Sequence, residues 1–374
     1  MKNRPLVSQI ALTIIPIILS LSITALLIMA VNADPREVFE KVWEGAFRDS
    51  RSFAQTINFW IPLTLASIGL IVTFTAGLWN IGVEGQMMVG AIAASGVALF
   101  VNLPPFLQLP VEIIMAMVGG ALWAAVVGIL KTRLGVHEIF GGVGFNALAN
   151  VLAIYLISGP WQPADGGSVH ATASFRPEAM LPALSSDFPT NLLGILIVFV
   201  SVIGVILALR GTRWGLELKA TGKNARSALL LGVPTQRSAL TAMMICGALA
   251  GIAGAYRVLF TIGSLRPQLP SGGIGFLGLL VVLLVANRAL WVPFVTFIFA
   301  AILGGSTRLK VALQLDQSLA GVLQGFLVLT VLLFNGVRQR LQERAQTTEE
   351  IAVATGFKPA STTPPATTEA VTHE

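Results

Sequence analysis

An ionisable residue, Glu84, lies between two long apolar runs in the stretch "GLWNIGVEGQMMVG", residues 77–90. Gly77, Gly82 and Gly85 surround it, and glycine lets a backbone bend and neighbouring segments approach closely. A carboxylate in an apolar segment is costly unless it has polar partners or a function. Three roles are open to it: satisfying unpaired backbone N–H groups, contacting a polar uncharged ligand, or carrying a proton.

The polar neighbours of Glu84 favour the first of these roles. We expect Asn80 to cap a helix, because its amide oxygen can accept a hydrogen bond from a free backbone N–H. Glu84 then falls early in that helix, where the positive end of the helix dipole favours an acid. A helix that begins inside a membrane exposes N–H groups, and Asn80, Glu84 and Gln86 are suited to satisfying them on an adjacent segment or to lining a water-filled cavity.

The composition indicates that the elements carrying these residues lie in a bilayer. The 374 residues are 55% hydrophobic and 11% charged, whereas a soluble domain carries roughly 25% charged residues. A membrane-spanning helix needs about 20 predominantly apolar residues. The sequence predicts an all-α integral membrane protein with about ten spans, at 7–31, 59–76, 82–101, 111–130, 139–158, 191–209, 239–260, 274–287, 291–307 and 317–335.

Basic residues predict the orientation. If the N-terminus is cytoplasmic, most of the 24 Lys and Arg residues fall in cytoplasmic segments, as the positive-inside rule expects. Both termini are therefore expected in the cytoplasm, and the net charge of +6 needs no nucleic-acid partner to explain it. The first apolar run exceeds the roughly 7–15 residues of a signal-peptide core, so we interpret it as an uncleaved span.

The remaining segments divide the chain. A transmembrane domain is expected over 1–344 and a disordered cytoplasmic tail over 345–374, which has few large apolar residues. Charges of both signs with aromatic residues at helical spacing predict an amphipathic external helix in 32–58. Proline, glycine and serine predict a long external loop in 159–190, and 210–238 is a basic cytoplasmic segment.

The sequence lacks common motifs for nucleotide binding and zinc catalysis. The pattern GxxxxGK[ST] is absent, since the one Gly-Lys pair, Gly222-Lys223, is followed by Asn224. "HEIFG" at 137–141 begins like a zinc-protease motif but lacks the second histidine ligand. No catalytic residue, metal site or cofactor is predicted for this chain.

The run "CGALAGIAGA" predicts close helix packing. Gly247, Gly251 and Gly254 leave a helix face without bulky side chains, which lets membrane helices approach each other closely. The same face could instead line a moving boundary between two halves of the protein. Cys246, the only cysteine, is interpreted as a small apolar packing residue.

The segment 210–238, "RGTRWGLELKATGKNARSALLLGVPTQRS", carries six basic residues and one acid. Asn224 can cap a short helix, "ARSALLL", which should end at Gly232 with Pro234 just beyond. A short helix between two spans is suited to docking a partner. The alternative is an ordinary basic loop that fixes the topology.

Four blocks carry a resemblance to a known family. "GLWNIGVEGQMMVGA", "LKATGKNARSALLLGV", "CGALAGIAGA" and "GIGFLGLLVVLLVANRALWVPF" come in the same order and with similar spacing as in permeases of bacterial ATP-binding cassette (ABC) importers. The group is the one that carries branched-chain amino acids, ribose and nucleosides. Over about residues 10–340 the chain most resembles the longer permease of nucleoside importers that use a basic-membrane-protein type lipoprotein.

The resemblance implies a permease for a nucleoside or related small polar solute in the bacterial cytoplasmic (inner) membrane. It also implies partners: separate ATP-binding cassette subunits that carry ATP and Mg²⁺, an external substrate-binding lipoprotein, and a second permease in a heterodimer or, alternatively, a homodimer. Other readings are the same class acting on a ribose-like sugar and, less favoured, an ion-coupled secondary transporter, which would transport without ATPase subunits.

The resemblance also assigns residues by position. The segment from Thr221 to Gly232 is similar to the coupling helix, which sits in a cleft of the ATP-binding subunit. In that assignment two residues shape its start and three form its packed face: Gly222 and Asn224, then Ala225, Ala228 and Leu229.

The path residues implied are Asn80, Glu84, Gln86, Asn146 and Phe276. Gly275 and Phe276 match a glycine-aromatic block that opens a late span, and Gly82 and Gly275 are expected at related positions of two structural repeats. After Glu138 the family often has Val/Ile-Thr-Met-Leu-Asn, whereas this chain has "IFGGVGFN" and keeps the asparagine. A different substrate size or shape preference is therefore expected.

Overall fold

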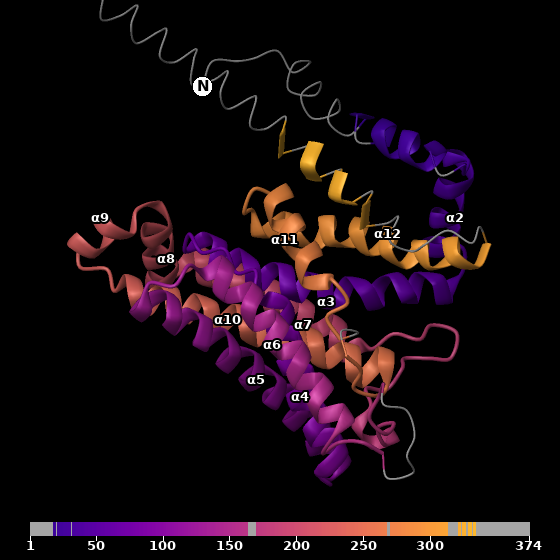
Figure 1. The fold of residues 1–374 in the computed structure, drawn as a ribbon, viewed down its shortest axis with the longest axis horizontal. Helices are drawn as coiled ribbons and strands as arrows, with labels where there is room; N and C mark the ends of the chain where they lie inside the picture. Colours follow the sequence, from indigo (N-terminus) through magenta and orange to yellow (C-terminus); the bar gives the residue numbers. More distant parts are fainter. Residues whose placement is uncertain are drawn as a thin grey trace, which may run out of the picture.

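The structure is a computed structural model, and it describes residues 18–312, except 20, 31, 164–169 and 268–269, together with most of 321–333. The described residues form a bundle of helices (Figure 1). The α-helices are α2 (Pro35–Phe47), α3 (Ser50–Thr75), α4 (Val83–Phe100), α5 (Pro105–Leu134), α6 (Glu138–Ser158), α7 (Leu192–Gly211), α8 (Arg213–Lys223), α9 (Ala225–Leu230), α10 (Thr235–Tyr256), α11 (Ile274–Leu284) and α12 (Val292–Ala312). Shorter turns are η1 (Pro177–Ala179), the π-helical η2 (Arg257–Ile262) and η3 (Ala289–Trp291).

Seven helices in the described part of the chain are long and apolar enough to cross a membrane. They lie at seven of the ten predicted windows, from 59–76 to 239–260 and at 291–307. The window 274–287 holds only the 11-residue α11. At 1.5 Å per residue such a helix is about 16 Å long, roughly half the apolar thickness of a bilayer.

The number of ten spans is not confirmed. The windows 7–31 and 317–335 lie partly outside the described residues, and the tail 345–374 and both chain ends lie wholly outside them. Within the first window, Leu21–Ala30 is a short apolar helix.

Two predicted boundaries were wrong. Helix α3 begins at Ser50, nine residues before the window, because Asp49 caps it by accepting a hydrogen bond from the Ser52 N–H at 2.7 Å. The segment 32–58 therefore holds α2 and the first turns of α3. Helix α5 likewise begins before its window, so Glu112 lies within a helix long and apolar enough to cross a membrane, and it is buried.

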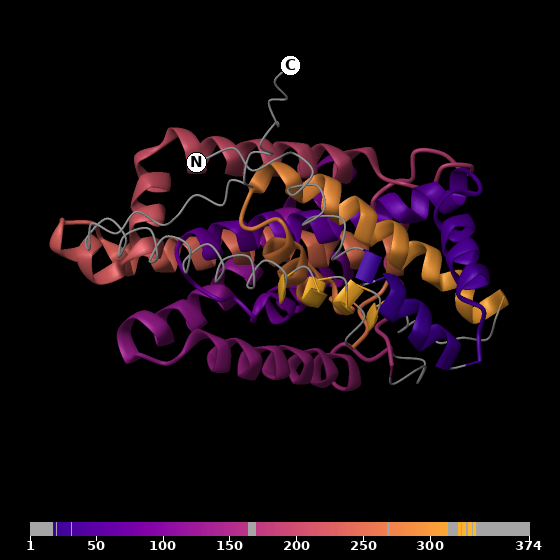
Figure 2. The same cartoon turned by 90° about the horizontal axis from the view of Figure 1, so that it is seen from above.

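The small residues of α10 pack at the centre of the bundle, which confirms the packing prediction. Helix α10 lies between α3, α4 and α5 (Figure 2). A methyl group added at Gly251 would overlap the Ala116 carbonyl oxygen of α5, and one added at Gly254 would overlap the Met87 carbonyl oxygen of α4. The helix backbones are therefore closer than side chains would allow.

The two ends of the bundle differ. Helices α8 and α9 project from one end, where α7 ends and α10 begins (Figure 1). At the other end, the described part of the loop 159–190 packs on the segment after α10 through backbone hydrogen bonds: Thr172 N to Leu265 O, Phe175 N to Gly263 O and Leu181 N to Leu259 O, at 2.9–3.0 Å. The described part of the loop thus covers that end.

Candidate functional site

Helix α11 begins inside the bundle, and Glu84 of α4 caps it. The Phe276 N–H donates to Glu84 Oε1 at 2.9 Å, and the Ser271 hydroxyl and the backbone amides of Gly273 and Gly275 also face this carboxylate. The N-cap residue of α11 is Gly273, which has no side chain with which to accept these hydrogen bonds. Glu84 is 7% exposed. The carboxylate therefore accepts hydrogen bonds from the N-terminal amides of a neighbouring helix, which matches the first of its three possible roles.

Helix α4 is capped in a similar way, but not by Asn80. The prediction that Asn80 is the N-cap was wrong, because Gly82 holds that position without a side-chain hydrogen bond. Instead Asn146 of α6 reaches across: its Oδ1 accepts from the Gly85 N–H at 2.7 Å, and its Nδ2 donates to the Ile81 carbonyl at 2.9 Å. Each of the two helix starts is thus completed by a side chain from another helix.

Asn80 and Gln86 form a closed amide pair. Each amide donates to the other's oxygen, at 3.0 and 2.9 Å, and both side chains are fully buried. The Asn80 amide also donates to Cys246 Sγ at 3.1 Å. Cys246 is accordingly a hydrogen-bond acceptor as well as a packing residue. Because both residues are buried and bind each other, the pair is not accessible to a solute in this conformation.

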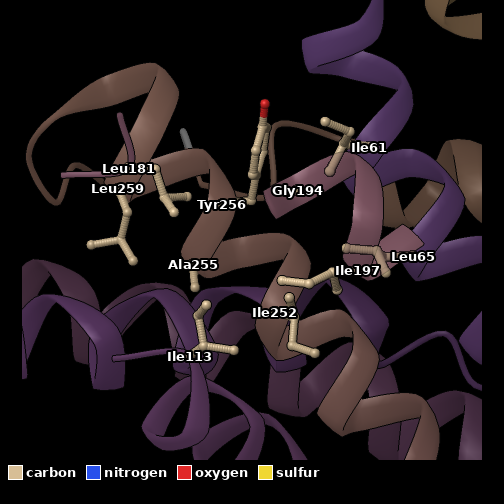
Figure 3. A pocket seen from close by; sticks show the side chains of 10 residues that line it. All are labelled: Ile61, Leu65, Ile113, Leu181, Gly194, Ile197, Ile252, Ala255, Tyr256 and Leu259. Carbon is tan, nitrogen blue, oxygen red and sulfur yellow. The ribbon is translucent and has the colours of Figure 1, made fainter. Parts of the chain in front are cut away.

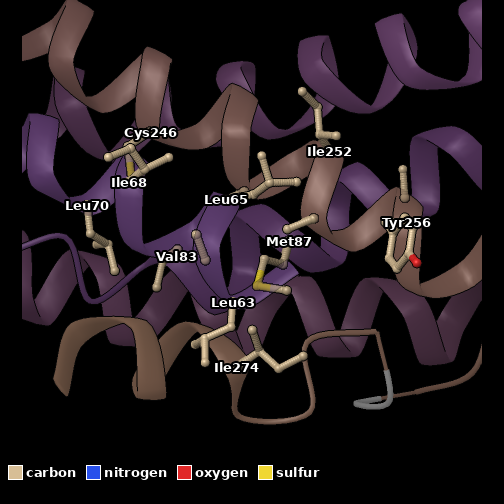
Figure 4. Close-up of a cluster of buried hydrophobic side chains, with 14 of the residues drawn as sticks. Leu63, Leu65, Ile68, Leu70, Val83, Met87, Cys246, Ile252, Tyr256 and Ile274 are labelled. Carbon is tan, nitrogen blue, oxygen red and sulfur yellow. The ribbon is translucent and has the colours of Figure 1, made fainter. Parts of the chain in front are cut away.

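Glycines let these elements meet. A Cβ added at Gly275 would lie 2.8 Å from Val83 Cγ1 and 3.0 Å from Glu84 Oε1. A Cβ added at Gly85 would lie 2.9 Å from Asn146 Oδ1. Figure 4 shows Val83 of α4, Leu63 of α3 and Ile274 of α11 in the apolar cluster beside this junction. We call the starts of α4 and α11, with Asn80, Glu84, Gln86 and Asn146, the helix junction.

The five predicted path residues separate into three sets. Glu84 contacts the backbone of Phe276, Asn80 pairs with Gln86, and Asn146 of α6 binds the start of α4. The Phe276 side chain is 48% exposed and Asn146 is partly exposed, so these two can reach the surroundings. Ser271 and Gly273 were missed by sequence analysis; the signal was the "SGGIGF" run, whose second glycine has φ +80°.

The short helix predicted after Asn224 is confirmed as α9, and its docking role stays a prediction. Asn224 Oδ1 accepts from the Ser227 N–H at 2.9 Å, and Gly232 follows with φ +82°. Helix α8, Arg213–Lys223, had not been predicted. Gly222 lies in the last turn of α8, which ends at Lys223, so Gly222 does not start α9. Thr221, also in α8, donates its hydroxyl to the Glu217 carbonyl at 2.8 Å.

A backbone contact joins this segment to the approach to α4. A Cβ added at Gly222 would overlap the Thr75 carbonyl oxygen, and one added at Gly77 would lie 3.1 Å from Gly222 Cα. Gly77 has φ +75°, a conformation that favours glycine. The sequence contained both glycines but did not indicate that they pair.

We call Thr221 to Gly232 the docking segment. Three of its leucines are not packed against other parts of the described chain. Leu229, Leu230 and Leu231 are exposed, and Leu230 and Leu231 are each 83% exposed. Ala225 is exposed too, whereas Ala228 is buried against the chain itself. Sequence analysis had singled out only Leu229 of the three. An exposed apolar group on an otherwise polar loop is typical of a protein interface.

Some other ionisable groups in the spans have contacts within the chain. Gln108 donates to Glu112 at 2.7 Å, and Lys131 pairs with Glu138 at 2.7 Å. Arg257 is buried over the Phe59 ring, 5.3 Å from its centroid. Among the described residues no group of three His, Cys, Asp or Glu side chains is arranged to hold a metal ion.

An apolar pocket between α3, α5, α7 and α10 is too small for a solute (Figure 3). Its volume is about 10 Å³, which is about that of a single water probe. Ile61, Ile113, Ile197 and Ile252 line it, and Tyr256 directs its hydroxyl away to Asn58 Oδ1 at 2.9 Å. The small pocket is therefore a packing defect, and the helix junction is the stronger candidate site.

Comparison with known proteins gives consistent matches. The family described as "Branched-chain amino acid transport system / permease component" matches residues 52–332. The chain is 29% identical to the guanosine ABC transporter permease protein NupP of Bacillus subtilis, over 87% of this chain and 93% of that protein. It is 27% identical both to the glucose ABC transporter permease protein TsgB13 of Haloferax volcanii (84% of this chain, 85% of that protein) and to the nucleoside ABC transporter permease protein NupB of Lactococcus lactis (80% and 84%).

Proposed function

The chain belongs to the family of permease components of branched-chain amino acid transport systems, and from that premise we propose its solute, its path and its coupling to ATP. It is a multi-pass membrane protein and a permease subunit of an ABC transporter. The proposed solute is a nucleoside, imported across the membrane. The single observation that carries the proposal is the alignment of nearly the whole chain with permeases named for guanosine and nucleosides.

The helix junction is compatible with an uncharged solute. The Glu84 carboxylate is already occupied by backbone N–H groups, and the Asn80 and Gln86 amides bind each other. A nucleoside carries hydroxyl and ring-nitrogen groups without net charge, so it needs no unpaired ionic partner. Phe276 and Asn146, the accessible members, are proposed to face the path, and Glu84, Asn80 and Gln86 to hold its walls.

A simple sugar is the second candidate. The match to TsgB13, named for glucose, covers most of both chains at an identity close to that of the nucleoside permeases. Sugars are also neutral and polar. An ion-coupled secondary transporter is less supported, since the three relatives above are all named as ABC transporter permeases.

Coupling is proposed to run through the contact between Gly222 and Gly77. We place Thr221 to Gly232, including Asn224, Ala225 and Leu229, in a cleft of the ATP-binding subunit, with the exposed leucines as anchors. Ala228 supports this helix from behind. Movement of α8 would push on the Thr75 to Gly77 backbone and so on the start of α4. The junction would then reopen the path on the other side, as alternating access requires.

The proposed assembly follows the family. This chain supplies the membrane path and no catalysis, and ATP and Mg²⁺ act on separate ATP-binding subunits. A second permease, more often different than identical, completes the path, and an external lipoprotein delivers the solute. The membrane is the bacterial cytoplasmic membrane, with residues 1–344 as the permease domain and 345–374 as a tail outside the described residues.

Uptake in proteoliposomes tests the proposal. The vesicles hold this chain with its partner permease, its ATP-binding subunits and its lipoprotein, and radiolabelled adenosine is added outside with ATP or a non-hydrolysable analogue inside. ATP-dependent uptake that unlabelled guanosine inhibits and unlabelled glucose does not would support a nucleoside. Inhibition by glucose or ribose alone would favour the sugar, and uptake driven by an ion gradient without ATP would contradict the ABC class for this chain.

A further inference from the structure

A second cavity lies beside α8, outside the helix junction. Its volume is about 450 Å³, and it is bounded by the ends of α3 and α7, by α8 and by the connection between α11 and α12. Three basic side chains line it: Arg210 of α7, Lys219 of α8 and Arg288 of the α11–α12 connection. We call it the three-cation cavity.

The three charges have no acidic counterpart in the described chain. No acidic side chain lines the cavity, and none of the three cations belongs to an ion pair found among the described residues. Lys219 donates to the Leu209 carbonyl in the last turn of α7, which fixes its ammonium at the cavity. Neighbouring like charges repel each other, so an anion bound between them would be attracted by all three.

The neighbouring cavity on the other side of α8 shows the contrast. It has a volume of about 430 Å³ and contains Arg213 and Arg237. Arg213 is paired with Glu217, another lining residue, at 3.1 Å. Cavity size and arginine content are thus similar, but one cavity contains its own acid and the other does not.

Apolar surface borders the three-cation cavity. Leu290 and Trp291 line it and are exposed, and tryptophan favours the membrane–water interface. Helices α7 and α12 both contact Trp60 of α3, through the Phe199 ring at 6.1 Å and the Pro293 carbonyl at 2.9 Å, so they flank one strip of α3. Beyond the cavity these two helices expose apolar side chains: Ile203, Leu207, Phe294 and Ile298.

We propose that the three-cation cavity binds the phosphate head group of an anionic phospholipid, with its acyl chains along the exposed faces of α7 and α12. A basic pocket between membrane helices at the cytoplasmic interface is suited to such a head group. The apolar strip favours a lipid over a free phosphate ion, which would use only the cations. The same end of the bundle carries α8 and α9, so the bound lipid would brace the docking segment against the membrane.

Thermal unfolding of the purified full-length chain in a neutral detergent tests this site. The probes are phosphatidylglycerol and phosphatidylcholine with the same acyl chains, and inorganic phosphate. The test variant is Arg210→Gln with Arg288→Gln, and the matched control is Arg213→Gln with Arg237→Gln. We expect phosphatidylglycerol to raise the unfolding midpoint of the wild type and the control by about 5 °C, and that of the test variant by less than half as much.

Each other result would overturn the proposal. Equal stabilisation by phosphatidylcholine would mean that the head-group charge is not recognised. Equal stabilisation by inorganic phosphate would indicate a small-anion site. An unchanged response of the test variant would place the lipid elsewhere. If no lipid stabilises the chain but the test variant no longer co-purifies with the ATP-binding subunits, the cations bind an acidic protein surface instead.

Discussion

Glu84 at the helix junction is 7% exposed, whereas Leu230 in the docking segment is 83% exposed. Each side chain has the exposure least expected of its type, since acids favour water and leucine favours a core. The difference lies in where their partners come from. Glu84 finds N–H donors on α11 of the same chain, while Leu230 has none of the described chain packed over it.

This contrast teaches that the two regions do different work. The junction finds its hydrogen-bond partners within one chain, and under the proposed function its residues determine whether the path is formed. The docking segment exposes its leucines in the described chain, and under the proposed function its residues determine whether the path responds to a partner. The Gly222 contact with Gly77 is where the two meet. Substitutions should therefore affect stability at the junction, coupling at the segment, and both at the contact.

Gly222→Val should have the largest effect, because it forces the two regions apart. The added side chain would overlap the Thr75 carbonyl oxygen, and overpacking of this kind costs about 1–3 kcal/mol or more. We expect a strong loss of folded chain in size-exclusion chromatography and a lower unfolding midpoint. Gly211→Val is the control, since a Cβ there meets no atom within 4 Å. Equal behaviour of the two variants would remove the contact from the coupling route.

Leu230→Asp with Leu231→Asp should separate coupling from stability. Both side chains are exposed, so the unfolding midpoint of the chain should stay the same. Uptake should fall by about tenfold or more, since 1.4 kcal/mol of lost docking energy is about tenfold in affinity. Leu184→Asp, an exposed leucine in the loop at the other end of the bundle, is the control. Normal ATP-dependent uptake by the double variant would contradict the docking assignment.

Glu84→Ala and Glu84→Gln sharpen the junction side of the comparison. Alanine leaves the Phe276 N–H without its acceptor, which costs about 1–3 kcal/mol, so both the unfolding midpoint and uptake should fall. Glutamine keeps a carbonyl oxygen for that N–H and should retain most uptake at every external pH. A loss in the glutamine variant that follows external pH would instead indicate proton coupling.

Asn224→Ala should have the smallest effect. It removes the cap of α9 and costs about 0.5–2 kcal/mol locally, so uptake should fall only a few-fold. Asn224→Asp keeps a capping oxygen and serves as the matched variant. Uptake assays on both variants measure the difference. If both lose uptake equally, Asn224 acts through its amide group, for example on the partner, and not through the cap.

Much of the fold could be predicted because its signals are local. Long apolar runs identified seven spans, and Asn224 with Gly232 identified α9. Helix α8 was missed because its glycines and basic residues look like a loop, yet it packs against α7 and α10. The early start of α3 was missed because most residues from Ser50 to Asn58 are polar, although Asp49 caps the helix at Ser50.

The candidate site was predicted by residue but not by partner. Glu84 was singled out, and its donor Phe276 lies 192 residues away along the chain. Asn80 was assigned as a cap from local pattern, but Gln86 and the distant Cys246 compete for its amide. Hydrogen-bonding capacity is a property of the residue, whereas the partner is a property of the packing.

The sequence by itself determined that this protein lies in a bilayer and that α10 can pack closely against its neighbours. Apolar composition requires a bilayer, and the glycines of α10 permit close helix contact, because both follow from side-chain chemistry alone. The tertiary structure decided which groups meet: Glu84 with the start of α11, Asn146 with the start of α4, and Gly222 with Gly77. A buried N–H must be satisfied by some acceptor, but only the three-dimensional arrangement brings one within hydrogen-bonding distance.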